Sequence, residues 1–503
     1  MAATASSDRV SDRRGWARRD WIAVALIVGI ASALRLLFLS DPPTLVFDET
    51  YYAKDACVYV EAEPAPCDLE TPQVEAHPPL GKWLIGIGIA IFGFDSFGWR
   101  ISAAAAGSLT VLLMYVLGRR LLGSTAGAVL AAALMTFDFL HFVQSRIAML
   151  DVFVTMFGVA AVLFALYDRD WVPGRASSAR LLRPYRLAAG VAAGGAIASK
   201  WSGAFFMVLV LALCTAWDVS RSRREEKPER RGVALRSAIS LLVCLLLVPL
   251  AVYLLTFAGR VHGSVAAPWS RGSWLGAVGH EQREMYLTHT RDIIDATHGY
   301  QSPAWSWILL KRPVAYFYEV NAKGQNEEIL ALGSPFVWWA SIPAFLYVAF
   351  SWVRRLIERR AYGGAEGLIV AGILLTYSPW LIQQTGRGAI FIFYLLPTVP
   401  FMCLALAYCA TRIGGSWEAR AAVAVFAATT VGLFGYFYPV LTKRPLPPEQ
   451  WKGRIWFDED DCRFRPNTTQ VTSTETKAGG AVIIRTSDST SEEGKPPRGW
   501  CWI

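Results

Sequence analysis

The chain has 503 residues, of which 54% are hydrophobic and only 18% are charged. This composition excludes an ordinary soluble enzyme of this size and indicates that the chain is solvated by a lipid bilayer. The formal net charge is +9, but no basic run is interleaved with aromatic residues in a soluble domain, so nucleic-acid binding is not expected.

Long apolar stretches recur along most of the chain and predict transmembrane helices. A helix that spans roughly 30 Å of hydrocarbon needs about 20 mostly apolar residues. Eleven stretches, three of them short or poorly separated, fit this pattern: 20–39, 99–118, 124–141, 147–167, 185–199, 202–217, 235–257, 335–353, 366–383, 390–411 and 419–439. A further stretch at 83–94 is too short to span comfortably and is interpreted as an interfacial or re-entrant helix. The expected fold class is therefore an all-α integral membrane protein with about eleven transmembrane helices, or twelve if this stretch spans.

Basic residues in alternate loops predict the orientation, because Lys and Arg are retained on the cytoplasmic side. With eleven helices, the basic groups all fall on one side: the N-terminal arginines, Arg119 and Arg120, Arg169 to Arg186, the run SRSRREEKPERR, and Arg354 to Arg360. We therefore expect a cytoplasmic N-terminal segment (1–19), a transmembrane catalytic domain (20–440) and an extracytoplasmic tail (441–503). The outer loops are 41–98 and 258–334. A cleaved signal peptide is not expected, since no small-residue cleavage site follows the first apolar stretch.

Four of the eight cysteines lie outside the membrane in this topology, and the other four lie in apolar helices. An oxidising exterior permits the disulfides Cys57–Cys67 and Cys462–Cys501, although the sequence does not fix the connectivity. No CxxC pair or HExxH motif suggests a metal site, and no phosphate-binding loop is present.

Ionisable residues gather at the expected outer membrane face, where charge is costly and often functional. They are Asp48, Glu49, His77, Lys82, Arg100, Arg146, Asp151, Lys200, His298 and Arg387. Interfacial anchoring or helix capping explains each one separately, but not their convergence on one face. The tryptophans at 305, 307, 338 and 339 are instead expected to form an aromatic belt.

This arrangement suits the transfer of a sugar from a lipid-linked phosphate. Negative charge grows on the phosphate as the sugar leaves, and fixed cations stabilise it; the candidates are Arg146, Lys200 and Arg387. An attacking hydroxyl must lose its proton to a carboxylate within hydrogen-bond reach. Asp48 and Glu49 are adjacent and point in different directions, so one is expected to be the base and the other to position substrate.

Six blocks occur in the order of a known family: FDETYYAKDA, HPPLGKWLIG, QSRIAMLDVF, ASKWSG, HGYQSPAWSW and RGAIFIFYLLPTVPF. From about residue 20 to 440, the chain resembles the protein O-mannosyltransferases, particularly those of actinobacterial type. The resemblance implies a GT-C glycosyltransferase that uses polyprenyl-phosphate-mannose as donor and transfers mannose, with inversion, to Ser or Thr hydroxyls of secreted or translocating proteins. It further implies a multi-pass protein of the bacterial plasma membrane, with membrane lipid and the secretion translocon as its surroundings.

The resemblance also implies site roles. Asp48 would be the general base and Glu49 would help hold the acceptor peptide. The residues that match family blocks, and would bind the donor's phosphate or sugar, are His77, Arg100, Arg146, Asp151, Lys200, His298 and Arg387. No cofactor is required, because cationic side chains can stabilise a lipid monophosphate leaving group. The resemblance does not decide whether a divalent metal also binds.

The C-terminal tail has a different composition from the rest of the chain. Residues 466–496 are rich in Ser, Thr, Gly and charge, which favours a flexible segment or a disulfide-closed flap, while AVIIR at 481–485 could form a strand.

Three alternative functions stay open. A related GT-C enzyme could modify a lipid or glycan, and transfer of an oligosaccharide to asparagine is less expected. A transporter would place its charges near the bilayer midplane. Acceptor preference, polyprenyl length and oligomeric state are not revealed.

Overall fold

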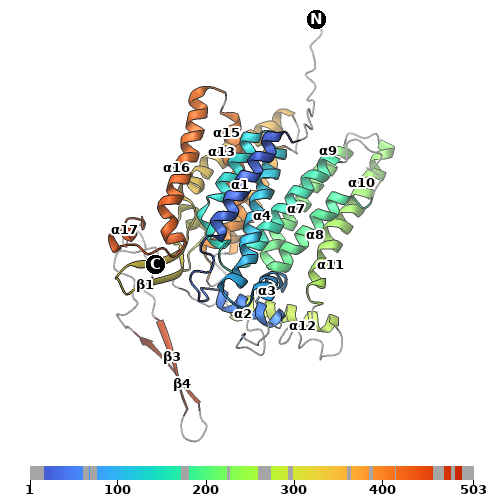
Figure 1. The fold of residues 1–503 in the computed structure, drawn as a ribbon. Helices are drawn as coiled ribbons and strands as arrows, with labels where there is room; N and C mark the ends of the chain where they lie inside the picture. The colour runs from blue at the N-terminus through green and yellow to red at the C-terminus, as the bar shows by residue number, and fades with distance from the viewer. Residues whose placement is uncertain are drawn as a thin grey trace.

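The computed structural model describes residues 16–60, 67, 76–171, 181–223, 227–258, 274–292, 298, 300–359, 364–383, 389–413, 415–456, 469–476 and 482–489. Long helices run side by side as a bundle, and short helices and hairpins gather at one of its ends (Figure 1). The apolar helices make this a multi-pass membrane protein.

The bundle is built from α1 (Arg18–Leu36), α4 (Ser96–Leu122), α5 (Thr125–Thr136), α6 (Phe139–Gln144), α7 (Asp151–Trp171), α8 (Pro184–Ser199), α9 (Ala204–Ser222), α10 (Lys227–Leu242), α11 (Val248–Leu255), α13 (Pro335–Arg359), α14 (Ala365–Gln383), α15 (Val399–Arg412) and α16 (Trp417–Leu441). Each of the eleven predicted segments overlaps at least one helix. Among the described residues, eight helices are long and apolar enough to cross a membrane. The segments 20–39, 124–141 and 185–199 lie on shorter or more polar helices, because charged residues or early breaks interrupt them.

The shorter elements are α2 (Glu49–Val60), α3 (Leu80–Phe92), α12 (Trp274–Leu287), α17 (Pro448–Lys452), β1 (Val314–Val320), β2 (Asn326–Ala331), β3 (Thr469–Thr476) and β4 (Val482–Ser489). The apolar stretch at 83–94 corresponds to α3, a helix of 13 residues. Each strand pair forms an antiparallel hairpin. β4 contains most of the strand predicted at 481–485, whereas the β1–β2 hairpin was not predicted.

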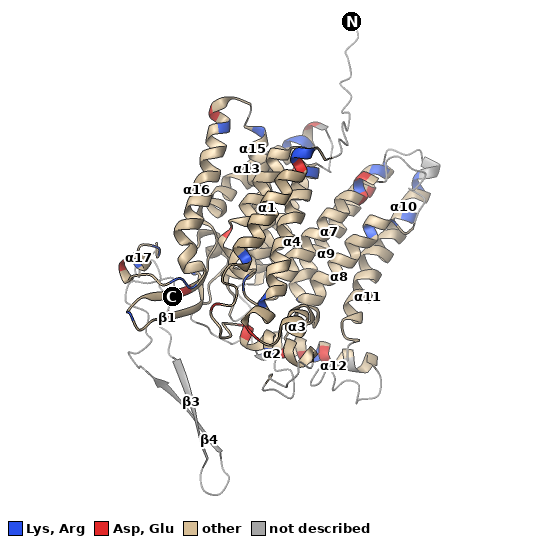
Figure 2. Ribbon diagram, viewed as in Figure 1, with Lys and Arg blue, Asp and Glu red and all other residues tan. Residues whose placement is uncertain are grey.

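Charges divide the bundle into two ends. Lys and Arg side chains concentrate where the N-terminus leaves the bundle, and α2, α3, α12 and β1 lie at the other end (Figure 2). We call these the basic end and the loop end. The basic end includes the start of α1 and the end of α4, whereas Asp48 and the start of α2 lie at the loop end.

Arginines at the basic end are paired with buried acids. Arg183 Nε donates to Asp168 at 2.8 Å, and its Nη1 lies 3.2 Å from Asp218. Arg186 donates to Asp218 at 2.7 Å and to Asp168 at 3.2 Å. These four residues link the ends of α7, α8 and α9. Three further pairs lie at neighbouring helix ends: Asp20–Arg119, Glu366–Arg355 and Asp170–Arg120, in the last of which the acid is only partly buried.

The expected aromatic belt is wrong for two of its tryptophans. Trp307 and Trp338 are buried inside the protein, whereas Trp305 is exposed. Trp338 Nε1 donates to Asp138 at 2.8 Å. A buried carboxylate that needs donors explains why Trp338 turns inward rather than toward the membrane surface.

Candidate active site

The loop after α1 is fixed by an arginine from a distant part of the chain. Arg146 donates to four carbonyl oxygens at the end of α1, those of Leu34, Arg35, Leu37 and Phe38, at 2.6 to 3.0 Å. The last carbonyls of a helix have no partner within it, so Arg146 caps α1 from the turn that precedes α7. Its predicted contact with the donor phosphate stays a prediction.

Glu49 begins α2 and is fully buried with Arg100. Arg100 Nε and Nη2 donate to the two carboxylate oxygens of Glu49, both at 2.8 Å. The amides of Val46 and Ala148 also donate to this carboxylate, at 3.0 and 2.8 Å. Arg100 further donates to three carbonyls of residues 39–44. Glu49 and Arg100 therefore hold the loop before α2 against the start of α4.

Asp48 has a different environment from its neighbour. Its carboxylate accepts one hydrogen bond within the described structure, from Tyr52 Oη at 3.2 Å. Tyr52 lies one helical turn further on, which brings the two side chains together. Burial raises the pKa of Asp48 to about 6, with the charge of Lys200 lowering it and that of Asp151 raising it. A carboxyl with a pKa near neutrality is suited to proton transfer.

Lys200 and Asp151 form a buried ion pair beside Asp48. Lys200 Nζ lies 3.1 and 2.9 Å from the two carboxylate oxygens of Asp151. Asp151 begins α7 and Lys200 follows the last residue of α8, so the pair joins two helix ends. The ammonium also lies 4.7 Å from the ring centre of Tyr394. An aromatic face strengthens the local preference for a cation.

An aromatic cluster, consisting of Phe47, Tyr316, Phe391, Phe393 and Tyr394, lies on the same side. Ring centres of Phe47 and Tyr316 are 4.6 Å apart, and those of Phe391 and Phe393 are 5.3 Å apart. Burial raises the pKa of Tyr316, and the charges of Asp151 and Asp48 raise it further. Gln144 donates to Tyr316 Oη at 2.6 Å. The cluster offers apolar ring faces next to a titratable carboxyl.

The two predicted histidines lie next to different aromatic residues of this region. The ring of His77 is 6.0 Å from Tyr52 and 5.5 Å from His289. His298 is exposed, and its ring is 5.2 Å from Phe391. Lys82, which follows His77 in the sequence block, forms a buried ion pair with Asp55 at 2.7 Å.

The structure therefore brings part of the predicted set together. Asp48, Asp151 and Lys200 form one electrostatic group, with His77 and His298 next to aromatic residues of the region, while Glu49, Arg100 and Arg146 lie in the framework behind it. Arg387 lies outside the described residues. Sequence reasoning missed Tyr52, Tyr316 and Tyr394; the four-residue spacing from Asp48 could have revealed Tyr52.

Cysteines and metal-binding groups were also predicted. The Cys57–Cys67 disulfide is confirmed and ties the end of α2 to the following loop. Cys462 and Cys501 lie outside the described residues, so their pairing stays a prediction. Within the described ranges, no group of three or more His, Cys, Asp or Glu could hold a metal ion.

Two family descriptions match successive parts of the chain. Residues 25–262 match "Dolichyl-phosphate-mannose-protein mannosyltransferase", and residues 277–460 match "C-terminal four TMM region of protein-O-mannosyltransferase". A polyprenol-phosphate-mannose–protein mannosyltransferase of Mycobacterium tuberculosis is 30% identical over 87% of this chain and 91% of its own. The corresponding Corynebacterium glutamicum protein is 25% identical over 88% and 94%.

Solved structures show the same fold. A chain of the Saccharomyces cerevisiae Pmt1-Pmt2 complex bound to the sugar donor has a TM-score of 0.71 at 16% identity, covering 88% of this chain and 93% of that one. ArnT of Cupriavidus metallidurans bound to undecaprenyl phosphate has a TM-score of 0.54 at 16% identity, covering 84% of this chain and 66% of that one. The chain therefore has the GT-C fold.

Proposed function

The chain belongs to the dolichyl-phosphate-mannose–protein mannosyltransferase family, and from this membership we propose that it transfers mannose from polyprenyl-phosphate-mannose to Ser and Thr hydroxyls of proteins. The observation that carries the proposal for this site is Asp48, a carboxyl with a pKa of about 6 whose one hydrogen-bond donor within the described structure is a phenol. It is the acid of the region best suited to accept a proton.

In the proposed reaction, Asp48 removes the proton of the acceptor hydroxyl as its oxygen attacks the anomeric carbon of mannose. The bond between this carbon and the phosphate oxygen breaks, and polyprenyl phosphate leaves with the electron pair. Attack from the face opposite the phosphate inverts the configuration. The protonated Asp48 then releases its proton to water. Every atom and charge is accounted for without a metal or other cofactor.

Cations near the leaving phosphate would stabilise its developing charge. Lys200 lies near enough to Asp48 to lower its pKa, and we propose that Lys200, together with Arg387, faces the phosphate. The aromatic cluster would pack against the sugar ring. Glu49, Arg100 and Arg146 support the loop that carries Asp48 through their contacts with main-chain groups.

The proposed topology places the loop end outside the bacterial plasma membrane and the basic end in the cytoplasm. The concentration of Lys and Arg at the basic end supports this orientation. Acceptors would then be secreted proteins, met during or after their passage through the translocon. The polar tail from 441 would lie on the same side as the site.

The test supplies membranes containing the protein with radiolabelled polyprenyl-phosphate-mannose and a Ser/Thr/Pro-rich peptide. Asp48→Asn is nearly isosteric and should lower transfer by about 10²- to 10⁴-fold, because it removes the base. The matched control is Glu284→Gln, an acid-to-amide change on α12 outside the site, which should transfer at the wild-type rate. Equal transfer by wild type and Asp48→Asn would show that a residue other than Asp48 is the base.

Donor binding is tested separately. Lys200→Ala and Arg387→Ala should each raise the KM for the lipid donor in a folded protein. Unchanged donor kinetics in both variants would contradict the assignment of the phosphate site. No transfer by the wild type would favour another lipid-phosphate substrate or a transporter.

A further inference from the structure

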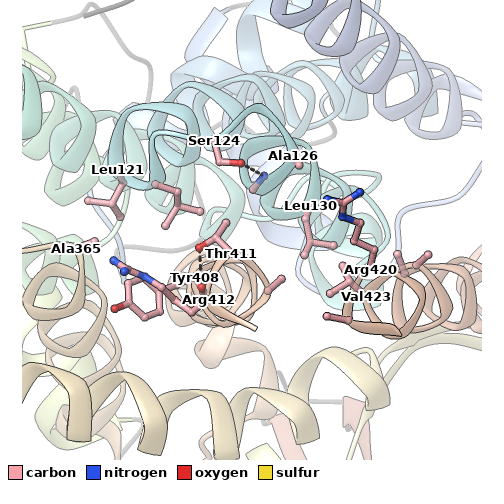
Figure 3. Close-up of a pocket in the computed structure, with 16 residues that line it drawn as sticks. Leu121, Ser124, Ala126, Leu130, Ala365, Tyr408, Thr411, Arg412, Arg420 and Val423 are labelled. Carbon is pink, nitrogen blue, oxygen red and sulfur yellow. Dashed lines mark hydrogen bonds between the residues drawn. The ribbon is translucent and has the colours of Figure 1, made fainter. Parts of the chain in front are cut away.

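A cavity of about 740 Å³ opens at the basic end, away from Asp48. It lies between the end of α4, the start of α5, the end of α15 and the start of α16 (Figure 3). Most of its walls are apolar side chains, including Leu122, Leu130, Val423 and Ala427. The short α5, with 12 residues, borders this space.

Two arginines lie among the cavity's residues. Arg412 ends α15 and Arg420 lies in the first turn of α16, and both side chains are exposed. In Figure 3, Arg412 lies beside Tyr408 and Ala365, whereas Arg420 lies beside Leu130 and Val423 on the other side of the cavity. Arg412 lies 5.0 Å from the ring centre of Tyr408. No Asp or Glu lines the cavity, and neither arginine makes an ion pair within the described structure.

Their lack of acidic partners, together with their position on the cavity, distinguishes the two residues from several arginines at the same end. Arg119, Arg120, Arg183, Arg186 and Arg355, at the same end of the bundle, each form an ion pair with an acid. Guanidinium groups without acidic partners attract anions, and their planar donors match phosphate oxygens.

One exposed tryptophan indicates that the cavity lies near a membrane boundary. Trp417, at the start of α16, is 73% exposed. Exposed tryptophans of membrane proteins concentrate at the level of lipid headgroups, and arginines there extend toward the polar phase. From this level, the apolar residues of α5 and α16 continue into the membrane-spanning part of the bundle. The cavity thus combines cations at headgroup level with an apolar wall below them.

We propose that this cavity binds an anionic diacyl phospholipid of the leaflet at the basic end. Its phosphate would lie at the rim of the cavity that carries these arginines, and one acyl chain would lie along Leu130, Val423 and Ala427. A zwitterionic lipid fits less well, because its ammonium group meets no carboxylate in the lining. This site is independent of sugar transfer at the loop end.

The test measures lipid retention by native mass spectrometry. The intact protein is purified in detergent with equimolar phosphatidylglycerol and phosphatidylcholine. Wild type should retain phosphatidylglycerol with about tenfold preference, the ratio that roughly 1.4 kcal/mol of charge-assisted bonding gives. Arg412→Gln with Arg420→Gln should abolish this preference. Ala424→Trp should fill the groove and abolish retention although both arginines remain.

The matched control is Arg231→Gln with Arg236→Gln, which removes two exposed charges of α10 at the same end and should retain the wild-type preference. Thermal unfolding identifies folded variants, and Arg420→Gln alone replaces the double variant if that one fails to fold. Equal retention of both lipids by wild type, or unchanged preference in the cavity variants, would overturn the proposal. So would full displacement of phosphatidylglycerol by equimolar undecaprenyl phosphate, which would identify an isoprenyl lipid as the occupant.

Discussion

Asp48 at the loop end has different partners from Asp168 and Asp218 at the basic end. At the basic end, Asp168 and Asp218 each interact with both Arg183 and Arg186. At the loop end, Asp48 accepts one hydrogen bond, from Tyr52. Two arginines therefore hold both Asp168 and Asp218, whereas burial beside a neutral donor raises the pKa of Asp48 to about 6. The first arrangement stabilises a structure, and the second supports chemistry.

The contrast recurs between two consecutive residues. Glu49 has Arg100 and two amides as donors, while Asp48 has the phenol of Tyr52. Glu49 can therefore fix the loop while Asp48 remains available for proton transfer. The following predictions test this division, beginning with the largest expected effect.

Glu49→Ala should cost about 3–5 kcal/mol of unfolding free energy, because it leaves Arg100 buried and unpaired. Unfolding in detergent with chemical denaturant measures the loss. The double variant Glu49→Ala with Arg100→Met should recover part of it, since no charge is then left unpaired. A loss of unfolding free energy smaller than the loss caused by Asp48→Asn would contradict the structural role of Glu49.

Asp168→Asn should cost about 1–3 kcal/mol. The loss is smaller because Asp218 still neutralises part of the charge of Arg183 and Arg186. The same unfolding experiment measures it, and mannosyl transfer per folded molecule should not change. A loss of transfer per folded molecule without a loss of unfolding free energy would contradict the purely structural role of Asp168.

Transfer by the wild type should rise with pH through about 6, because the base must be ionised and the pKa of Asp48 is raised to about 6. For the same reason, protonation of Asp48 favours the folded state, and its contribution to stability is lost as pH rises through 6. Lys200→Ala should move the limb of the pH–rate profile upward by roughly one unit, because it removes the charge that lowers this pKa. An unchanged midpoint of the pH–rate profile would show that Lys200 does not influence the pKa of the base.

Tyr52→Phe should have the smallest effect. It removes the one hydrogen bond to the Asp48 carboxylate, worth about 0.5–1.5 kcal/mol, so the midpoint of the same profile should rise by less than about one unit. The fold should be preserved, since Phe fills nearly the same volume. A downward shift would show that the phenol does not stabilise the ionised acid.

Hydrophobic periodicity was sufficient to locate the helices, because a bilayer imposes length and apolarity on every span. The blocks around Asp48, Asp151 and Lys200 were likewise recognisable from sequence. The ion-pair partners could not be predicted from the sequence. Arg100 pairs with Glu49 from 51 residues away, and sequence position says nothing about such a contact. The aromatic cluster was missed because Tyr316 and Phe391 come from separate segments and read as ordinary apolar residues.

The cap that Arg146 places on α1 also concerns the biogenesis of the protein. The carbonyls that it caps precede it by 108 to 112 residues. At about 5–20 residues per second, the ribosome needs roughly 5–20 s to make the intervening chain. During that interval, the final carbonyls of α1 lack this arginine as a donor. Its last turn can reach its final state only after Arg146 has been synthesised, so the loop that carries Asp48 matures late in biogenesis.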